Sequence, residues 1–387
     1  MGAHQTYDVV VVGAGVFGVW TAWHLAQRGQ KVLVLDAYGP ANARASSGGE
    51  SRIIRMGYGA DELYTRWSVS SLAKWKQFCS ATGEGLFQQT GVLWLGPEGD
   101  ARLSQTMIAL ERCRVPFDRF NRRELENKYP QFNLDELSAG LLEPGSGVLM
   151  ARRAVAAVLQ DALKHGAEYR VAEILRTPKN TAAATLDTVK TSAGEQFAAR
   201  TFVFACGAWL GKMFPDELGS RIFPSRQEVF FFGSPPGDTQ FSSPALPTWL
   251  IQSDEVYGMP DLENRGFKIA LDQHGPLTDP DTQSRVVSSH SIEQASSYVA
   301  RRFPLLRNAP IVETRVCQYE NTSNGDFLID RHPRMENVWL AGGGSGHGFK
   351  HGPAFGEYLA AQILDSAPPE PRFSLSSKGT AQNRAVY

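Results

Sequence analysis

The feature that most constrains the fold is a glycine-spaced turn between two apolar runs near the start of the chain. The first run, "YDVVVV" (residues 7–12), is followed by Gly13, Gly15 and Gly18 in the spacing G-x-G-x-x-G. A helical pattern comes next, and the second run, "KVLVLD", ends at Asp36. A strand, a glycine turn, a helix and a second strand in this order are typical of the βαβ unit that binds dinucleotides. We therefore predict a dinucleotide site at this turn.

Each part of this unit has a physical role in holding a dinucleotide. Gly13 permits the tight turn, Gly15 lets a pyrophosphate approach the backbone, and Gly18 lets helix and strand pack closely. The helix N-terminus attracts phosphate charge, and Asp36 can accept hydrogen bonds from a ribose hydroxyl. The candidate cofactor contacts in this unit are Gly13, Gly15, Val16, Phe17, Gly18, Asp36 and Ala37.

The charge balance excludes several kinds of partner. The 387 residues carry 39 Lys and Arg against 40 Asp and Glu, a formal net charge of -1. We therefore expect no broad basic surface that would attract nucleic acid or an anionic membrane. No apolar run approaches the roughly 18 residues that would span a bilayer, so no membrane association is expected.

Targeting and cysteine signals predict a reduced, cytoplasmic protein. The first residues lack a basic segment followed by an apolar one, so no secretory signal is expected. The last residues are not a peroxisomal tripeptide. The four cysteines, with no CxxC pair, do not make a disulfide framework; they are Cys79, Cys113, Cys206 and Cys317. We find no cluster with metal-ligand spacing.

The segment after Asp36 decides which dinucleotide is expected. It reads "AYGPANARASSGGESRIIRMGYG" (residues 37–59) and is rich in Gly, Ser and Arg. A nicotinamide-dependent dehydrogenase would continue in regular βαβ units, and this chain does not. On composition alone the segment is equally well explained as a wrapping around a cofactor or as a solvated loop.

Five motifs in fixed order resemble one known family. They are "VVVVGAGVFGVWTAWHLAQRGQKVLVLD", "SSGGESRIIRMGYG", "TFVFACGAW", "NGDFLIDRHP" and "NVWLAGGGSGHGFKHGPAFGE". Together they resemble the FAD-dependent amine and amino-acid oxidases of the D-amino-acid oxidase superfamily, in the branch of monomeric sarcosine oxidase and N-methyltryptophan oxidase. The resemblance covers about residues 7–365. It implies an α/β (α+β overall) fold, with a Rossmann-type FAD-binding domain and a discontinuous antiparallel-sheet substrate domain.

The resemblance also implies how the two domains divide the chain. The FAD-binding domain is expected to comprise residues 1–85, 150–215 and 316–387, and the substrate domain residues 86–149 and 216–315. Apolar runs predict further strands of the first domain at residues 168–175 and 201–209. Alternating patterns predict strands of the second domain at residues 227–235 and 266–275, with one face of the sheet packed.

Cys317 stands in the polar stretch "RVCQYEN". A lone cysteine is most often a small buried hydrophobe. In the family, a cysteine two residues before a tyrosine and upstream of "DFLIDRHP" is joined to the flavin through a thioether. The resemblance therefore implies covalent FAD at Cys317, and a buried free thiol is the alternative. Cys206 lies in an apolar run, where core packing is the simpler interpretation.

The remaining cofactor contacts follow from the resemblance. The dense glycine cluster near residue 344 requires close backbone approach to some group, and the family places it along the flavin ring. His347 lies in this loop and is expected to have a structural role or to contact the flavin edge rather than to act as a base. The contacts implied are Ser46, Ser47, Arg52, Val171, Cys206, Gly207, Trp209, Cys317, Gly342, Gly344, Gly346, His347, Gly348 and Lys350.

An amino-acid substrate needs a cationic clamp for its carboxylate, and Arg suits this because its planar fork binds in two places. Arg55 matches the carboxylate-binding arginine of the family, and Lys350 the lysine that completes the clamp. Arg52 matches a residue close to the flavin ring. Most Arg and Lys residues are surface cations, so position in the motifs is what selects these three.

Three more residues are assigned to the reaction. Lys268, in "GFKIALD", matches the family lysine at the flavin face where oxygen is reduced, and its charge would stabilise developing negative charge there. A lysine that simply points out of a strand is the alternative. Tyr257, in "EVYGMPD", matches an active-site tyrosine, with ordinary sheet packing as the alternative. Asp272 is similar to an aspartate of enzymes that oxidise cyclic imino acids.

The chain departs from sarcosine oxidase at two positions. That enzyme has histidines where this chain has Gly48 and Asp272. Glycine opens space, and the aspartate favours a cationic or hydrogen-bond-donating amine. We therefore expect a secondary amino acid, N-methylated or cyclic, rather than sarcosine itself.

The function implied is oxidation of the C–N bond of such an amino acid to an imine, with O2 reduced to H2O2. Three alternatives remain open: a flavin amine dehydrogenase with another electron acceptor, a non-catalytic FAD-binding subunit of a complex, and a nicotinamide-only Rossmann enzyme. The partners implied are a small amine or amino acid and O2, and the family implies a monomer.

Overall fold

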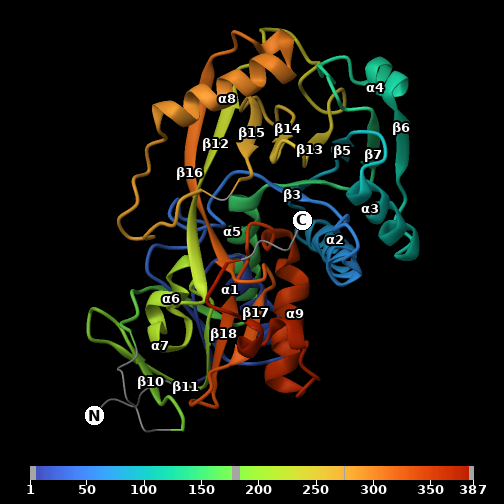
Figure 1. Cartoon of the computed structure of the whole chain (residues 1–387). Coiled ribbons are helices and arrows are strands. Elements are labelled where there is room, and N and C mark those ends of the chain that lie inside the picture. The colour runs from blue at the N-terminus through green and yellow to red at the C-terminus, as the bar shows by residue number, and fades with distance from the viewer. Residues whose placement is uncertain (1–5, 177–183, 274, 383–387) are drawn as a thin grey trace.

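The computed structural model describes residues 6–176, 184–273 and 275–382. Within these residues, two large sheets and one small sheet form the framework. In Figure 1 the seven-stranded sheet occupies the lower half of the molecule and the eight-stranded sheet the upper half. The first and last residues of the chain, from which the absence of targeting signals was predicted, lie outside or at the edge of the described ranges.

The seven-stranded sheet has a parallel centre. Five of its strands run parallel, whereas an edge strand and a branch strand are antiparallel to their neighbours. The order is β17 (Leu328–Arg331), β18 (Val338–Gly342), β11 (Gln196–Phe204), β1 (Thr6–Val12), β2 (Val32–Asp36) and β9 (Glu168–Val171), with β10 (Thr188–Lys190) beside β11. The predicted strand–turn–helix–strand unit is confirmed, with α1 (Val16–Gln27) between β1 and β2.

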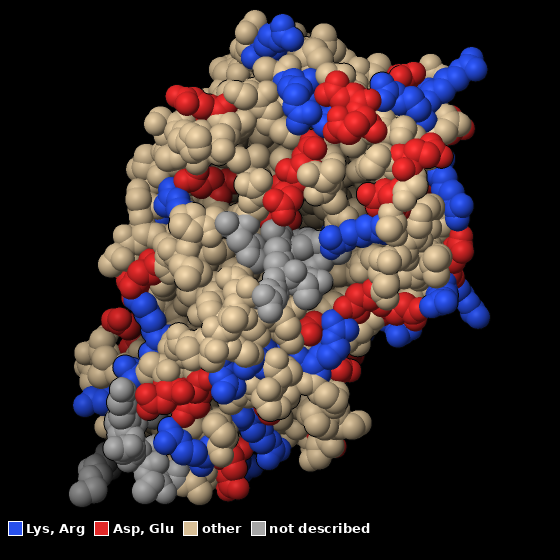
Figure 2. Space-filling model, viewed as in Figure 1, with Lys and Arg blue, Asp and Glu red and all other residues tan. Residues whose placement is uncertain are grey.

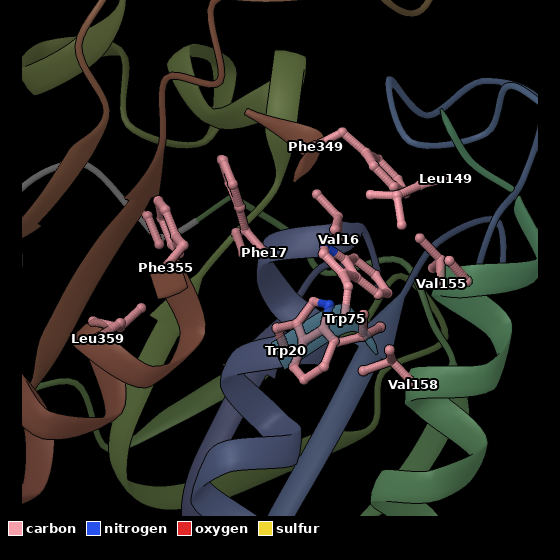
Figure 3. Close-up of a cluster of buried hydrophobic side chains, with 14 of the residues drawn as sticks. Val16, Phe17, Trp20, Trp75, Leu149, Val155, Val158, Phe349, Phe355 and Leu359 are labelled. Carbon is pink, nitrogen blue, oxygen red and sulfur yellow. The ribbon is translucent and has the colours of Figure 1, made fainter. Parts of the chain in front are cut away.

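The centre of this sheet is buried on both faces, as the continuous apolar run of β1 predicts. Val9 and Val11 contribute to one hydrophobic cluster, and Val10 and Val12 to another. The first cluster is covered by α1, α5 (Ala151–Lys164) and α9 (Gly352–Leu364). Figure 3 shows Trp20 of α1 between side chains of α5 and α9.

Helices α1 and α9 approach each other closely at Gly356. A Cβ placed on this glycine would lie 2.5 Å from the backbone carbon of Trp20. A larger residue would therefore push the two helices apart. Because the glycine turn lies at the start of α1 and the second glycine cluster precedes α9, this contact sets the spacing between the two loops that line the site.

Two predicted strands of this sheet end earlier than expected. The strand expected at residues 168–175 ends at Val171, after which only an isolated bridge at Ile174 remains. The strand expected at residues 201–209 begins earlier, at Gln196, and ends at Phe204. Its parallel neighbours pair no further than Phe204, so the chain turns into the 3-10 helix η1 (Gly207–Trp209). Cys206 consequently lies in a turn rather than inside a strand, which corrects its predicted setting.

The eight-stranded sheet consists mainly of antiparallel pairs. Its order is β16 (Ile311–Thr322), β12 (Ile222–Phe232), β15 (Phe267–Leu271), β14 (Val256–Met259), β13 (Thr248–Ile251), β5 (Val92–Gly96), β7 (Ala139–Glu143) and β6 (Asp118–Asn121). The prediction of an antiparallel sheet is wrong at one pair, since β13 and β5 are parallel. Two sets of antiparallel strands meet there, and their edge strands run in the same direction.

The prediction that one face of this sheet is packed is also wrong for β15. Phe267 and Ile269 face the cluster under α8 (Ser289–Arg302), but Lys268 and Ala270 on the opposite face are buried as well. The second face is buried because it covers the interior between the two sheets. The expected strands 227–235 and 266–275 end at Phe232 and Leu271, and residue 274 lies outside the described residues.

A small third sheet joins the segments around the site. β3 (Arg52–Ile54) and β4 (Phe87–Gln88) both pair antiparallel with β8 (Gly147–Leu149). The predicted domain boundaries stay a prediction, and the one at residue 316 falls inside β16. The other helices are α2 (Glu62–Thr82), α3 (Ala101–Arg112), α4 (Arg122–Lys128), α6 (Leu210–Met213) and α7 (Pro215–Leu218). Among the residues that the structure describes, no helix is both long and apolar enough to cross a bilayer.

Candidate FAD and substrate site

A main cavity of about 390 Å³ lies at the carboxyl ends of β1, β2 and β11. It is lined by the glycine turn, the segment after Asp36, the residues after β9 and β11, the end of β16 and the loop before η3 (Phe349–His351). This position outside the carboxyl ends of parallel strands is where open α/β sheets bind ligands. The volume lies within the range of cofactor and ligand pockets.

The glycine turn is built for close packing. Gly13 has φ +112°, and a Cβ at this position would lie 2.2 Å from the carbonyl oxygen of Ala205. The N–H of Ala14 donates to Asp36 Oδ2 at 2.8 Å, and the N–H of Val16 donates to Ser47 Oγ at 3.1 Å. The turn thereby connects the second strand and the segment 37–59. Burial raises the pKa of the Asp36 carboxyl, although the N–H of Ala14 favours its charged form.

Most predicted cofactor contacts lie around the main cavity. Its lining includes Gly13, Gly15, Val16, Phe17, Asp36, Ala37, Ser46, Ser47, Arg52, Cys206, Gly207, Trp209, Gly344, Gly346 and Gly348. The predicted contacts outside the lining are Gly18, Val171, Gly342, His347, Lys350 and Cys317. Val171 is largely exposed, at 64%, and the residues that follow it line the cavity instead. All of these assignments stay predictions, those in the lining included.

Cys317 lies at the border of the main cavity. Its Sγ is 3.3 Å from Arg52 Nη2 and 3.9 Å from the carbonyl oxygen of Ser46. It lines a second cavity of about 20 Å³ together with Lys268 and Arg52, and Arg52 also lines the main cavity. Sequence motifs far apart in the chain therefore meet at this thiol.

Lys268, which is buried, lies beside the half-buried Arg52 on this side. Lys268 Nζ donates to the carbonyl oxygen and the hydroxyl of Ser51, at 3.0 and 3.1 Å. Burial, with the positive charge of Arg52 as a second cause, lowers the pKa of Lys268 well below its usual value. The lysine predicted from the resemblance is thus an interior residue, and the alternative of a solvent-facing strand lysine is wrong.

The side chains of Arg55 and Lys350 both contact the aromatic ring of Tyr58. The guanidinium of Arg55 lies 4.5 Å from the ring centre of Tyr58 and 4.7 Å from that of Trp94. Lys350 Nζ lies 5.0 Å from the Tyr58 ring centre and donates to its hydroxyl at 2.6 Å. Both cations are buried, and burial followed by the charge of Arg55 lowers the pKa of Lys350 well below its usual value.

The hydrophobic core positions Lys350 directly. Trp75 stacks on Phe349, and its indole N–H donates to the carbonyl oxygen of Lys350 at 2.9 Å. Figure 3 shows Trp75 and Phe349 in the same cluster as α1. The Tyr58 hydroxyl also lies 3.1 Å from His347 Nδ1 and 2.8 Å from His351 Nε2. The end of the Lys350 side chain is therefore fixed by a buried polar network.

Arg55 is presented by a backbone segment that Glu143 holds. This carboxylate accepts from the N–H groups of Met56 and Gly57, at 2.6 and 3.0 Å. It also accepts from the indole of Trp94 and the hydroxyl of Ser146, at 2.8 and 2.6 Å. With four donors and almost no exposure, Glu143 fixes both the segment after Arg55 and one of the rings that flank it.

We expect the substitution Glu143→Gln to destabilise the protein by about 1–3 kcal/mol, since an amide leaves at least one buried donor without an acceptor. The free energy of unfolding in urea, compared between the parent and the variant, measures the effect. Glu126→Gln is the matched control, because Glu126 is an exposed residue of α4. Equal unfolding free energies for the two variants would contradict this role of Glu143.

Tyr257 and Asp272 face the same region from the eight-stranded sheet. Tyr319 donates its hydroxyl to Asp272 Oδ1 at 3.0 Å. Burial raises the pKa of Tyr257 to about 12, with the charge of Arg52 as an opposing cause. The charge of Asp272 favours the charged form of the neighbouring Lys350. The carboxylate thus lies near Lys350, and Tyr257 lies near Arg52.

Sequence reasoning missed several residues of this arrangement. Tyr58 and His351 lie inside quoted motifs but were given no role, whereas Trp94 and Glu143 lie outside the motifs, and the sequence offers no local signal for them. Tyr58 lies in the segment 37–59 that was left open, and the structure now shows this segment as part of the wall of both cavities.

The comparisons with known proteins identify the family of the chain. The family model described as "FAD dependent oxidoreductase" matches residues 8–362. The chain belongs to this family. Monomeric sarcosine oxidase of Bacillus sp. (strain NS-129) is 31% identical, with 96% of each chain covered. N-methyl-L-tryptophan oxidase of Salmonella arizonae is 28% identical, over 94% of this chain and 96% of that one.

The fold also has solved relatives. The crystal structure of L-proline dehydrogenase from P. horikoshii matches with a TM-score of 0.83 at 22% identity, covering 96% of this chain and 98% of that one. The predicted family and fold class are confirmed, and the chain is an FAD-dependent oxidoreductase. The alternative of a nicotinamide-only Rossmann enzyme is therefore wrong.

The residues of the main cavity fit FAD. The buried hydroxyl of Ser46 and the carboxyl oxygen Oε1 of Glu320 have no hydrogen-bond partner among the described residues, and both residues line the cavity. These acceptors suit a ligand rich in hydroxyl groups, while Gly15, whose Cβ would meet only Ser47 Oγ at 3.5 Å, leaves room for a pyrophosphate at the backbone. Among the described residues no group of three His, Cys, Asp or Glu could hold a metal ion. Figure 2 shows cationic and anionic residues interspersed on the face in view.

Proposed function

We propose that the protein oxidises the C–N bond of a secondary amino acid, N-methylated or cyclic, to an imine, with O2 reduced to H2O2. In the net reaction, two electrons and two protons pass from the substrate to O2, which becomes H2O2. Bound FAD supplies the acceptor for the hydride equivalent of the substrate. The imine then hydrolyses in water.

The observation that carries the proposal is the pair of buried cations at Tyr58. Arg55 and Lys350 both contact this ring, and among the described residues neither forms an ion pair with a carboxylate. Burial, followed by the charge of Arg55, lowers the pKa of Lys350 even though Glu143 and Asp272 oppose the shift, and buried like charges are costly without an anion in direct contact. A substrate carboxylate supplies that anion and gains charge-assisted hydrogen bonds from both residues.

The opposite side of the site favours the amine. Asp272 and the hydroxyl groups of Tyr319 and Tyr257 can accept hydrogen bonds from a secondary ammonium group or stabilise its charge. A carboxylate clamp and an anionic residue facing it suit an α-amino acid rather than a simple amine. Gly48 lines the second cavity, but a Cβ on it would lie 1.9 Å from the carbonyl oxygen of Asn42, so the glycine allows close packing there and the expectation that it opens space is wrong.

Anaerobic mixing tests this function. The FAD-loaded protein is mixed with N-methyl, cyclic and primary amino acids, the visible absorbance is followed, and air is then admitted. Bleaching by secondary amino acids and rapid recovery with formation of H2O2 are the expected results. Bleaching with slow recovery in air would favour a dehydrogenase, and no bleaching by any amino acid would contradict the proposal.

The proposal includes a thioether between Cys317 and FAD. The support is the position of its Sγ beside Arg52 and Ser46 at the border of the main cavity. Forming this bond releases two electrons and two protons, for which O2 is the acceptor. The Cys317 thiol is half-buried and lines the second cavity.

We expect Cys317→Ser to convert the flavin from acid-stable to acid-extractable. After precipitation in trichloroacetic acid, the yellow colour should stay in the pellet of the parent protein and move to the supernatant of the variant. Cys113→Ser, which changes a cysteine outside both cavity linings, should behave as the parent. A parent protein that loses all its colour to the supernatant would show that the flavin is not covalently bound.

The protein is further proposed to act as a monomer in the cytoplasm. The support for a monomer is the printed name of the sarcosine oxidase relative. Sedimentation velocity of the FAD-loaded protein distinguishes a 42.5 kDa monomer from a dimer.

A further inference from the structure

Glu320 is a buried acidic residue of the main cavity to which the proposed reaction gives no role. Its side chain is 6% exposed and belongs to the cavity lining. It lies near the end of β16, where its backbone pairs with Pro224 of β12. Its carbonyl oxygen accepts from the N–H of Ser345 at 2.9 Å. Both the sheet and the glycine loop therefore fix the place of this carboxyl.

The carboxyl of Glu320 is only partly satisfied by the protein. Among the described residues, Oε1 has no hydrogen-bond partner and no cation forms an ion pair with the side chain. A Cβ on Gly342 would lie 2.3 Å from Oε1, so the glycine leaves the space that the carboxyl occupies. Burial raises the pKa of Glu320 to about 7, and the N–H groups of Gly343 and Gly344 partly oppose this shift. A buried oxygen without a donor is costly, so a ligand that brings donors fits here.

The position of Glu320 along the cavity identifies the part of the ligand that it meets. Burial, followed by the charges of Asp36 and Glu320, raises the pKa of the Cys206 thiol, which therefore lies close to both carboxylates. Asp36 marks the nucleotide end, beside the glycine turn. Cys317 marks the opposite end and precedes Glu320 by three residues of extended strand, about 10 Å. Glu320 thus lies between the two ends, where FAD has its ribityl chain.

We propose that Glu320 is a cofactor-positioning residue whose carboxyl binds hydroxyl groups of the ribityl chain of FAD. The ribityl hydroxyls are hydrogen-bond donors, and the free carboxyl oxygen is an acceptor. Bonds from hydroxyl groups to a carboxylate are among the stronger ones in proteins. The chain between the two ends of the cofactor is thereby held in place, and with it the placement of the flavin ring against Arg52 and Cys317. The proposal concerns the cofactor alone and does not depend on the identity of the substrate.

The test measures reversible binding of two ligands to the apoprotein. Cys317→Ser serves as the parent, so that a covalent bond cannot hide differences in affinity. Glu320→Leu and Glu320→Gln are added to it, and FAD and ADP are titrated into each by calorimetry. ADP carries the adenosine and the pyrophosphate but no ribityl chain. Its binding also reports whether the nucleotide end of the cavity is folded.

We expect Glu320→Leu to weaken FAD binding by about ten- to a hundredfold, the loss of hydrogen bonds to a charged group, while ADP binding is unchanged. Glu320→Gln keeps an acceptor oxygen but no charge, so a loss of about three- to tenfold is expected.

Unchanged FAD affinity in Glu320→Leu would overturn the proposal. Equal losses for FAD and ADP would overturn it too, because the carboxyl would then support the cavity as a whole rather than the ribityl chain. If Glu320→Leu fails to fold and therefore does not bind ADP, Glu320→Gln is the deciding variant. An FAD affinity of Glu320→Gln equal to that of the parent would then contradict the proposed role of Glu320.

Discussion

Replacing Lys268 with methionine is expected to slow the recovery of the visible absorbance in air by about two to three orders of magnitude, the usual effect of removing one electrostatic stabiliser. Anaerobic bleaching by the amino acid should change far less. The reason is the position of Lys268 beside Cys317 and Arg52 in the second cavity. Its ammonium can stabilise negative charge as electrons reach O2, whereas the proposed carboxylate clamp is formed by Arg55 and Lys350.

The buried setting of Lys268 makes this effect large. A charge whose water has been removed interacts more strongly with a developing anion than an exposed charge does. Its two hydrogen bonds to Ser51 hold the ammonium in one place. Because burial lowers its pKa, the ammonium is lost as pH rises, at lower pH than for an exposed lysine. The reaction with O2 should therefore slow as pH rises in the parent, and this dependence should be absent in Lys268→Met.

Stopped-flow absorbance with separate anaerobic and aerobic mixing measures the two halves of the reaction. Lys76→Met, at an exposed lysine of α2, is the matched control and should leave both halves unchanged. If Lys268→Met slows bleaching and recovery equally, the lysine acts on the fold of the site rather than on O2. If neither half changes, the assignment to oxygen reduction is wrong.

The first βαβ unit could be predicted from the sequence because its signals are local. The apolar run of β1, the glycine spacing and the acid at the end of β2 all lie within residues 7–36, and each keeps its predicted place. Strand ends elsewhere depend on distant neighbours. Cys206 lies beyond the end of β11 because β1 and β18 pair no further, and no local pattern contains that information.

The same distinction applies to the candidate site. Arg55, Lys268 and Lys350 could be selected because each lies in a motif that resembles the family. Their surroundings could not, since Tyr58 lies between Arg55 and Lys350 through contacts that join residues almost three hundred positions apart. Glu143, on β7 of the eight-stranded sheet, accepts hydrogen bonds from the backbone of the segment after Arg55. A hydrophobic pattern places such a residue on a strand but does not name its partners.

Replacing Arg55 with methionine is expected to raise the dissociation constant of the amino-acid substrate by about a hundredfold, because charge-assisted hydrogen bonds to the carboxylate are lost. The concentration dependence of the anaerobic bleaching rate gives this constant. The matching amine without the carboxylate serves as the control substrate, and its dissociation constant should not change. A loss for both substrates would show that Arg55 supports the site rather than the carboxylate.

The conservative variant separates charge from shape at this position. Arg55→Lys keeps a positive charge but not the planar group that lies between the rings of Tyr58 and Trp94. We expect its dissociation constant to lie between those of the parent and Arg55→Met. Equal constants for Arg55→Lys and the parent would mean that charge alone is needed.

Lys350 gives the clamp a dependence on pH with a defined sign. Burial and the neighbouring charge of Arg55 lower its pKa, so the ammonium is lost as pH rises through a range below the usual one for lysine. A bound carboxylate favours the ammonium, and affinity for the amino acid should therefore fall as pH rises. In Arg55→Met the repulsion from Arg55 is gone, the pKa of Lys350 rises, and the fall in affinity should move to higher pH. A pH profile that does not move would show that the two cations do not act on one carboxylate.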